Sequence, residues 1–257
     1  MNCELHHGDC LEVMPQIPDG SVSLVLCDLP YGVTACKWDS QIPLAPLWEQ
    51  YERVITPDGA IVLFATQPFT TTLISSRMEL YRYSWVWVKE KAANFQLANI
   101  QPLKQTEDVL VFSKAKSANG ASPRLRYYPI LERRDTPLKY GGNIGTNLLH
   151  KSSMKKLDKV YDTRHPSNLL FCPKEYGEES IHPTQKPVPL LSYLVRTYTL
   201  KGETVLDNCM GSGSTGVACV ETRRDFIGIE KSERFFSLAK ERIERRKAQG
   251  TQEELFA

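Results

Sequence analysis

The sequence lacks the long apolar runs and tandem repeats that mark several large classes of protein. No stretch of eighteen or more apolar residues is present, which argues against a transmembrane helix. The segment Met1–His7 has no basic stretch followed by an apolar one, so no signal peptide is expected. We therefore expect a cytoplasmic protein without a membrane partner. Its 257 residues are enough for one large α/β domain or two small ones.

Paired cysteines are also missing. The seven cysteines are odd in number and scattered, and no C-x-x-C pair occurs. This pattern argues against both a disulfide framework and a zinc site, and it fits a reducing compartment. We expect no metal site, and most of the cysteines should be small buried apolar residues.

Charge is unevenly distributed, although the net charge is only +2. The segment Lys114–Arg164 holds twelve Lys and Arg against four Asp and Glu, so the rest of the chain is mildly acidic. Such a segment is typical of a phosphate-contacting surface, but a solvated basic loop would look the same. On charge alone the two interpretations remain open.

Seven β-rich apolar runs alternate with segments of helical pattern, which predicts a largely parallel sheet covered on both faces. The expected strands are Cys3–His6, Val22–Cys27, Ala60–Ala65, Tyr83–Val88, Asp108–Phe112, Thr204–Leu206 and Phe226–Ile229. The expected helices are Leu44–Ile55, Phe69–Leu80, Pro189–Tyr198, Thr215–Thr222 and Glu233–Ala248. Residues 1–113 and 180–250 should form the core, 114–179 an inserted recognition region, and 251–257 a flexible tail.

A glycine-rich turn near the C-terminus suggests a cofactor site. Gly211, Gly213 and Gly216 match G-x-G-x-x-G between the strand ending at Asp207 and a helix, and Glu230 ends the following strand. Such a turn brings backbone N–H groups close to a ligand, and the carboxylate can hold two ribose hydroxyls. Nicotinamide dinucleotide enzymes use the same spacing. However, too few residues follow Gly216 to complete their sheet in the normal order.

A second motif, Asp28-Leu29-Pro30-Tyr31, directly follows the most continuous apolar strand. Ligands bind at this end of strands in open α/β sheets. Asp28 and the Leu29 carbonyl can each accept a hydrogen bond from one N–H of an exocyclic amine. These two bonds free the nitrogen lone pair for attack. Pro30 stiffens the turn, and Tyr31 can stack on an extruded base. Without this context, a turn cap and a rim aromatic would explain the same four residues.

Taken together, these motifs resemble the S-adenosylmethionine-dependent amino-methyltransferases of DNA, in the permuted beta arrangement. That group places its D-P-P-Y-like motif before the recognition region and its cofactor motif near the C-terminus. The resemblance also covers Gly8-Asp9-Cys10 and the H-P-T-Q-K-P segment His182–Pro187. It implies a Rossmann-like α/β fold, with a seven-stranded mostly parallel sheet in circularly permuted class I order. Asp28 and Asp207 would then end neighbouring central strands.

The resemblance implies S-adenosylmethionine as cofactor, DNA as partner and transfer to adenine N6. A leading Asp favours adenine N6, but cytosine N4 or an RNA acceptor stays open, and so does a silent DNA-binding protein. The absence of a Pro-Cys dipeptide argues against attack through a ring carbon. Leu29 and Met210 depart from the commoner Pro and Phe. The implied cofactor-binding residues are Asp9, Cys10, Asp28, Thr184, Gln185, Lys186, Asp207, Met210, Gly211, Ser212, Gly213, Ser214, Thr215 and Glu230.

DNA contacts are expected mainly in the basic insertion. The candidates are Lys89, Arg124, Arg126, Arg133, Arg134, Lys139, Lys155 and Lys156. The terminal Gln252–Phe256 is similar to the Q-x-x-L-F peptide that docks bacterial sliding clamps, which predicts a second partner. The sequence leaves open whether the protein is a monomer or a homodimer.

Overall fold

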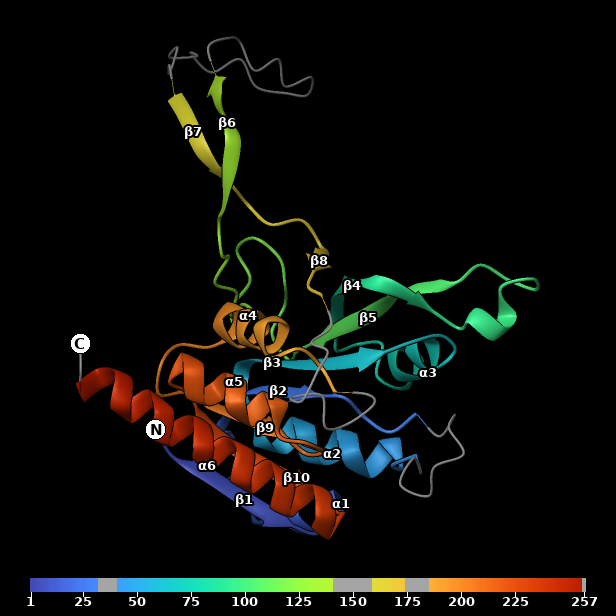
Figure 1. Ribbon diagram of the computed structural model, residues 1–257, viewed down its shortest axis with the longest axis vertical. Coiled ribbons are helices and arrows are strands. Elements are labelled where there is room, and N and C mark those ends of the chain that lie inside the picture. The colour runs from blue at the N-terminus through green and yellow to red at the C-terminus, as the bar shows by residue number, and fades with distance from the viewer. Residues whose placement is uncertain (32–40, 141–158, 174–184, 256–257) are drawn as a thin grey trace. The chain divides into compact units, whose positions relative to one another are not determined.

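A computed structural model of the protein describes residues 1–31, 41–140, 159–173 and 185–255. The chain divides into two compact units, Met1–Tyr128 with Asn168–Ala257 and Pro129–Ser167. The larger unit contains the main sheet and its helices (Figure 1). The smaller unit contains an antiparallel pair of strands, β6 (Glu132–Tyr140) and β7 (Lys159–Arg164).

The main sheet has eight strands in the order β1-β10-β9-β2-β3-β5-β4-β8. The bounds are β1 (Cys3–His7), β2 (Val22–Cys27), β3 (Ile55–Ala65), β4 (Tyr81–Ala93), β5 (Lys104–Phe112), β8 (Leu169–Phe171), β9 (Thr204–Asp207) and β10 (Asp225–Glu230). All seven expected strands are present, and β8 adds an eighth, which pairs with β4. The five strands from β1 to β3 run parallel, whereas β5 is antiparallel to both of its neighbours.

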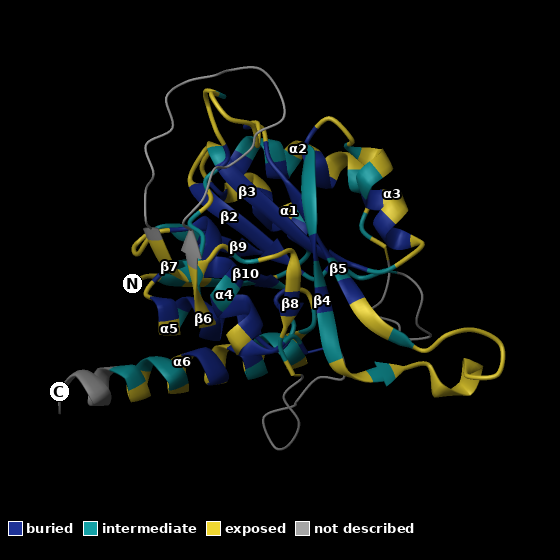
Figure 2. Cartoon of the chain, turned by 90° about the horizontal axis from the view of Figure 1, so that it is seen from above, coloured by how far each residue is buried: buried dark blue, intermediate teal, exposed yellow. Residues whose placement is uncertain are grey.

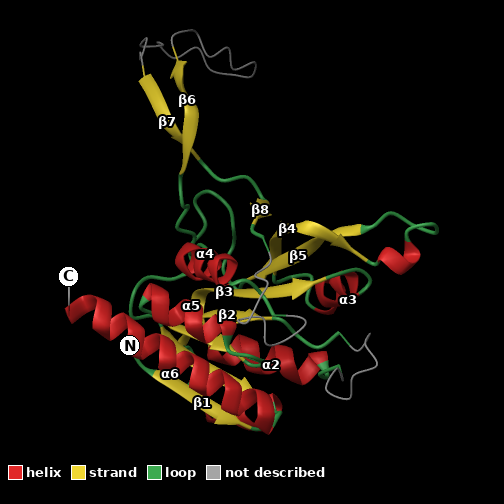
Figure 3. Cartoon of the chain, viewed as in Figure 1, coloured by secondary structure: helices red, strands yellow, loops and turns green. Residues whose placement is uncertain are grey.

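Helices cover both faces of this sheet, as the alternation of strands and helices predicts (Figure 3). One face packs against α4 (Val188–Tyr198), α5 (Ser214–Thr222) and α6 (Glu233–Leu255). The other packs against α1 (Cys10–Val13), α2 (Leu44–Val54) and α3 (Phe69–Ser76). Two short 3₁₀ helices, η1 (Met14–Gln16) and η2 (Phe95–Leu97), complete the described elements.

The central strands are apolar on both sides because both faces are covered. In β2, Leu24 and Leu26 contact the α4–α6 layer, and Val25 and Cys27 contact the α1–α3 layer. Every residue of β2 is buried, and Figure 2 shows β2 and β3 as the dark interior of the unit. A strand buried on both faces reads as a continuous apolar run, which is why the sequence located β2 correctly.

The strand order brings the two motifs together. β2 lies directly beside β9, with Leu24 opposite Val205 and Val25 opposite Leu206. Asp28 follows β2 and Asp207 ends β9, so the prediction that they end neighbouring central strands is confirmed. Residues separated by about 180 positions in the sequence therefore reach the same edge of the sheet.

Part of the expected insertion belongs to the larger unit. Leu125 is buried in its core, and the Arg126 and Tyr128 backbone N–H groups donate to the Asp58 and Thr197 carbonyls. The smaller unit, Pro129–Ser167, is accordingly a shorter stretch of sequence than the 114–179 insertion that was expected. At the other end of the chain, α6 continues to Leu255, through most of the segment expected to form a tail.

Candidate active site

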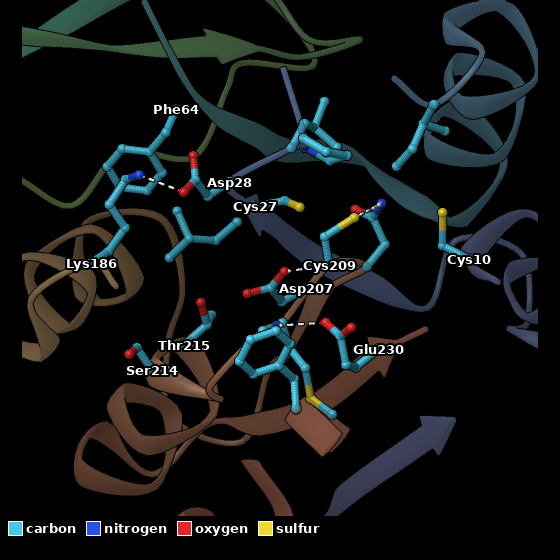
Figure 4. Close-up of a pocket in the computed structure, with 18 of the residues that line it drawn as sticks. Cys10, Cys27, Asp28, Phe64, Lys186, Asp207, Cys209, Ser214, Thr215 and Glu230 are labelled. Atoms are coloured by element: carbon cyan, nitrogen blue, oxygen red, sulfur yellow. Dashed lines mark hydrogen bonds and ion pairs between the residues drawn. The ribbon is translucent and has the colours of Figure 1, made fainter. Parts of the chain in front are cut away.

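A cleft of about 900 Å³ opens at the carboxyl ends of the central strands. Both sequence motifs line it (Figure 4). The predicted site residues that line the cleft are Asp9, Cys10, Asp28, Leu29, Pro30, Tyr31, Lys89, Gln185, Lys186, Asp207, Met210, Gly211, Ser212, Ser214, Thr215 and Glu230. The structure therefore brings the catalytic and cofactor candidates to one cavity.

The glycine turn between β9 and α5 shapes one end of the cleft. Gly211 and Gly213 have φ of 52° and 77°, in the left-handed region that favours glycine. A Cβ at Gly211 would meet nothing within 4 Å, whereas one at Gly213 would come within 2.9 Å of the Ala239 Cβ. Gly213 thus allows the turn to pack closely against α6, whereas Gly211 borders open space.

Glu230 ties this turn to the end of β10. Its carboxylate accepts from the Gly211 backbone N–H at 2.9 Å and from the Ser232 N–H at 2.7 Å. An ionised carboxylate has about four acceptor positions, so two remain for a ligand's hydroxyl groups. Glu230 is one of the labelled side chains around the cleft in Figure 4.

Asp9 forms the adjacent wall as the N-cap of α1. Its Oδ1 accepts from the Leu11 N–H at 2.9 Å, and its Oδ2 lies 3.0 Å from the Lys231 Nζ. The hydrogen bond from Lys231 is the main reason that the pKa of Asp9 lies below its ordinary value. Asp9 is therefore an ionised acceptor at the rim of the cleft.

Asp207 is buried at the end of β9, where burial raises its pKa to about 6. Its Oδ1 accepts from the Cys209 N–H at 3.1 Å, and its side chain also bonds the side chain of Thr215. These bonds offset part of the desolvation cost, but the charged form remains disfavoured.

We expect Asp207→Asn to stabilise the ligand-free protein at neutral pH. Because the pKa of Asp207 is higher in the folded state than in the unfolded state, the folded protein holds this proton more tightly. The free energy of unfolding therefore falls as pH rises from about 4 to 6. Removing the carboxylate should raise the free energy of unfolding by roughly 2–3 kcal/mol at pH 7.5 and by little at pH 4. Urea unfolding at both pH values measures this, with the exposed Asp19→Asn as control. Equal effects at the two pH values would contradict the assignment.

The Asp28 carboxylate lies at the other end of the cleft in a network of polar groups. Its Oδ1 accepts from the Tyr31 hydroxyl at 2.8 Å, and its Oδ2 accepts from the Lys186 Nζ at 2.5 Å. Figure 4 shows the Lys186 side chain beside the Phe64 ring and directed toward Asp28. Its Nζ is 4.9 Å from the centre of that ring. Burial raises the pKa of Tyr31, and the nearby carboxylates raise it further, so its hydroxyl keeps its proton.

Glu107 on β5 is a buried member of this network that sequence reasoning missed. Its carboxylate lies 2.9 Å from the Lys186 Nζ and 2.7 Å from the Lys89 Nζ. The apolar pattern indicated a strand only from Asp108 onward, so Glu107 carried no periodic signal. Only the pairing of β5 with β4, which places Trp87 opposite Glu107, locates its carboxylate in the cleft.

Sequence reasoning also missed two buried side chains, Tyr51 and Arg242, that bond to the glycine turn. The Tyr51 hydroxyl of α2 donates to the Asn208 Oδ1 at 2.7 Å. From α6, Arg242 donates to the Ser214 Oγ at 2.9 Å and to the Ser212 carbonyl at 3.2 Å. These bonds hold the glycine turn from both layers of helices, and no local sequence pattern indicates them.

The predicted DNA contacts are dispersed. Arg126 pairs with Asp58 at 2.7 Å and with Glu203, both in the larger unit. Arg124 and Arg133 are exposed, and the Arg134 Nε donates to the Thr163 carbonyl at 3.1 Å. Lys139 lies in β6. Lys155, Lys156 and Thr184 lie outside the described residues, and so do the side chains of Gln252–Phe256. Their roles stay predictions.

Within residues 1–31, 41–140, 159–173 and 185–255, no group of three or more His, Cys, Asp or Glu is arranged to hold a metal ion. Across the same ranges, no helix is long and apolar enough to cross a membrane.

The chain is similar to known DNA methyltransferases over most of its length. The family model described as DNA methylase (N6_N4_Mtase) matches residues 22–241. The type II methyltransferase M2.MboI of Moraxella bovis is 25% identical over 254 residues, covering 94% of this chain and 87% of that protein. Two solved structures share the fold at lower identity. The M1.HpyAVI–SAM complex has a TM-score of 0.60 at 23% identity, covering 93% of this chain and 99% of that one. The cytosine-N4-specific PvuII DNA methyltransferase has a TM-score of 0.66 at 15% identity, covering 97% and 92%.

Proposed function

Because this chain belongs to the DNA methylase family N6_N4_Mtase, we propose that it transfers a methyl group from S-adenosylmethionine to the N6 amine of adenine in DNA. The observation that carries the proposal is the shared cleft. The Asp28 carboxylate and the glycine turn with Glu230 line the same cavity, as a methyl donor and an amine acceptor require. The M1.HpyAVI structure, solved as a SAM complex, supports this choice of cofactor.

The cofactor half of the cleft fits an adenosine with a charged amino-acid tail. Glu230 keeps acceptor positions for ribose hydroxyls, and the missing Cβ of Gly211, which would point into open space, lets a ligand approach the backbone. Asp9 and Cys10 would border the adenine, and Gln185 and Ser212 would border the opposite end. When bound, S-adenosylmethionine supplies an electrophilic methyl group. Thr184 is proposed to hold it from the sequence motif alone.

In the half of the cleft lined by Asp28–Tyr31, the chain activates the target amine, which is a poor nucleophile. Asp28 accepts one N–H of the target amine and the Leu29 carbonyl accepts the other, which directs the nitrogen lone pair toward the donor. Pro30 fixes the turn, and Tyr31 stacks on the base after it leaves the duplex. Tyr31 itself is held by Phe69, with ring centres 4.9 Å apart. The charge on Asp28 stabilises the positive amine formed during transfer until the amine releases its proton to solvent water.

DNA binding is proposed for the predicted basic side chains of both units. Arg133 is exposed on β6, and guanidinium groups suit both phosphates and guanine edges. Arg126 is a weaker candidate, because its two ion pairs with Asp58 and Glu203 already compensate its charge. Removing it would also disturb the larger unit.

Methylation mapping in cells that express the protein tests the proposed base. Long-read sequencing should detect N6-methyladenine in one sequence context, and Asp28→Ala should remove it. N4-methylcytosine in a fixed context would instead support the second candidate acceptor, which the fold shared with the cytosine-N4-specific PvuII enzyme keeps open. Unmodified DNA in cells that contain the folded protein would contradict both acceptors.

A further inference from the structure

Four charged side chains form a continuous chain along one wall of the cleft. The Lys186 Nζ bridges Asp28 at 2.5 Å and Glu107 at 2.9 Å, and the Lys89 Nζ meets the other Glu107 oxygen at 2.7 Å. The order is therefore Asp28, Lys186, Glu107 and Lys89, with alternating charge. Two positive and two negative groups cancel, as a water-poor site requires.

Burial is greatest in the middle of this chain. The side chains of Glu107 and Lys186 are 6% and 10% exposed, whereas Asp28 is 25% exposed and faces the cleft. Glu107 is thus shielded from solvent by its partners, and Asp28 is the member that a substrate can reach. Lys186, Glu107 and Lys89 thus support the Asp28 carboxylate, which is the group that a ligand in the cleft can contact.

Resting on the proposed function, we infer that Glu107 is a positioning residue that shares Lys186 with Asp28 and thereby keeps Asp28 a strong acceptor for the target amine. An ammonium paired with Asp28 alone would hold that carboxylate as a closed ion pair. Because Glu107 lies on the opposite side of Lys186, the ammonium divides its donors between two carboxylates. Lys89 offsets the second negative charge.

Other groups also face Asp28. The Tyr31 hydroxyl donates to its Oδ1 and lies 3.4 Å from the Glu107 Oε1, so it connects the same two carboxylates. Among the described residues, Asp207 on β9 and the buried Cys27 thiol on β2 also interact electrostatically with Asp28. Burial raises the pKa of Cys27 to about 12, so at neutral pH this thiol contributes no charge.

The pKa directions agree with this geometry. Burial raises the pKa of Asp28, Lys186 lowers it and Glu107 raises it, with a net upward shift. For Glu107, burial also raises the pKa, but Lys186 and Lys89 outweigh that effect and the net shift is downward. Glu107 therefore stays ionised, and its negative charge is one of the effects that raise the pKa of Asp28. Loss of Glu107 and loss of Lys186 should consequently move the pKa of Asp28 in opposite directions.

The test is the pH profile of methyl transfer at saturating cofactor, measured with Glu107→Gln, Lys186→Met and the double variant. Activity needs ionised Asp28, so wild-type kcat should fall on the acid side. Glu107→Gln should move that acid limb down by about one pH unit and lower the plateau, and Lys186→Met should move it up by about one unit. The double variant, which loses one charge of each sign, should return the limb toward the wild-type position. Glu90→Gln and Lys201→Met, both exposed, serve as matched controls with unshifted limbs.

The outcomes separate the inference from the function it rests on. A wild-type protein without methyl transfer defeats the proposed function itself. Transfer by wild type and its loss in Asp28→Asn, with limbs that stay fixed or move in the same direction, overturns the role of Glu107 alone. A uniform drop in rate at every pH would indicate a merely structural role and also overturn it. If Lys186→Met does not fold, the near-isosteric Glu107→Gln decides, because only a downward shift agrees with the inference.

Discussion

Asp28→Asn should lower kcat for methyl transfer to DNA by about 10³-fold while the protein stays folded and still binds S-adenosylmethionine. The amide keeps the shape of the side chain but loses its charge. It also turns one acceptor into a donor, which then faces either the Lys186 ammonium or the target amine. The remaining oxygen cannot serve Lys186, Tyr31 and the substrate equally well.

Single-turnover rates with labelled cofactor measure this loss, and calorimetric titration measures cofactor affinity in the same preparations. Asp19→Asn is the matched control, because the Asp19 side chain is 78% exposed and its ion pair with Arg53 lies at the surface. Wild-type rates in Asp28→Asn would show that the carboxylate takes no part in the transfer. A parallel loss of cofactor binding would instead place Asp28 mainly in the cofactor site.

The second large effect is expected in the cofactor half, where Glu230→Gln should weaken S-adenosylmethionine binding by about 30-fold. Glu230 accepts two backbone N–H groups in the free protein and has acceptor positions left for ribose hydroxyls. The amide nitrogen must face either a backbone N–H or a hydroxyl, and a lost hydrogen bond to a charged group costs about 1.5–3 kcal/mol.

Calorimetry measures this affinity, and Glu233→Gln is the control because Glu233 is exposed in the first turn of α6. At saturating cofactor, kcat of Glu230→Gln should approach the wild-type value, since the amine half of the cleft is intact. Unchanged affinity in Glu230→Gln would remove Glu230 from the cofactor site.

The strands of the main sheet could be predicted from the sequence for a clear physical reason. Strands buried on both faces, such as Val22–Cys27, are continuous apolar runs, and glycine turns interrupt them in a recognisable way. The resemblance to permuted methyltransferases, which the order of the two motifs supports, implies that Asp28 and Asp207 end neighbouring strands, and the pairing of β2 with β9 confirms this.

Elements that depend on tertiary pairing could not be predicted in this way. β8 has three residues and is defined by its pairing with β4, and the β6–β7 pair lies in a segment without apolar alternation. Glu107 is a polar residue just before an apolar run, and it acquires its role only through Lys186, 79 positions later. Lys186 was expected near the cofactor, whereas its ammonium contacts Asp28 and Glu107. Its role toward the cofactor stays a prediction.

The most direct test of the central claim follows the methyl group itself. Duplex DNA is incubated with the purified protein and S-adenosylmethionine carrying a deuterated methyl group, then digested to nucleosides and analysed by mass spectrometry. We expect the label in N6-methyldeoxyadenosine with wild-type protein and its near absence with Asp28→Asn. Label in 5-methyldeoxycytidine, or label that persists undiminished in Asp28→Asn, would contradict amine methylation at this cleft.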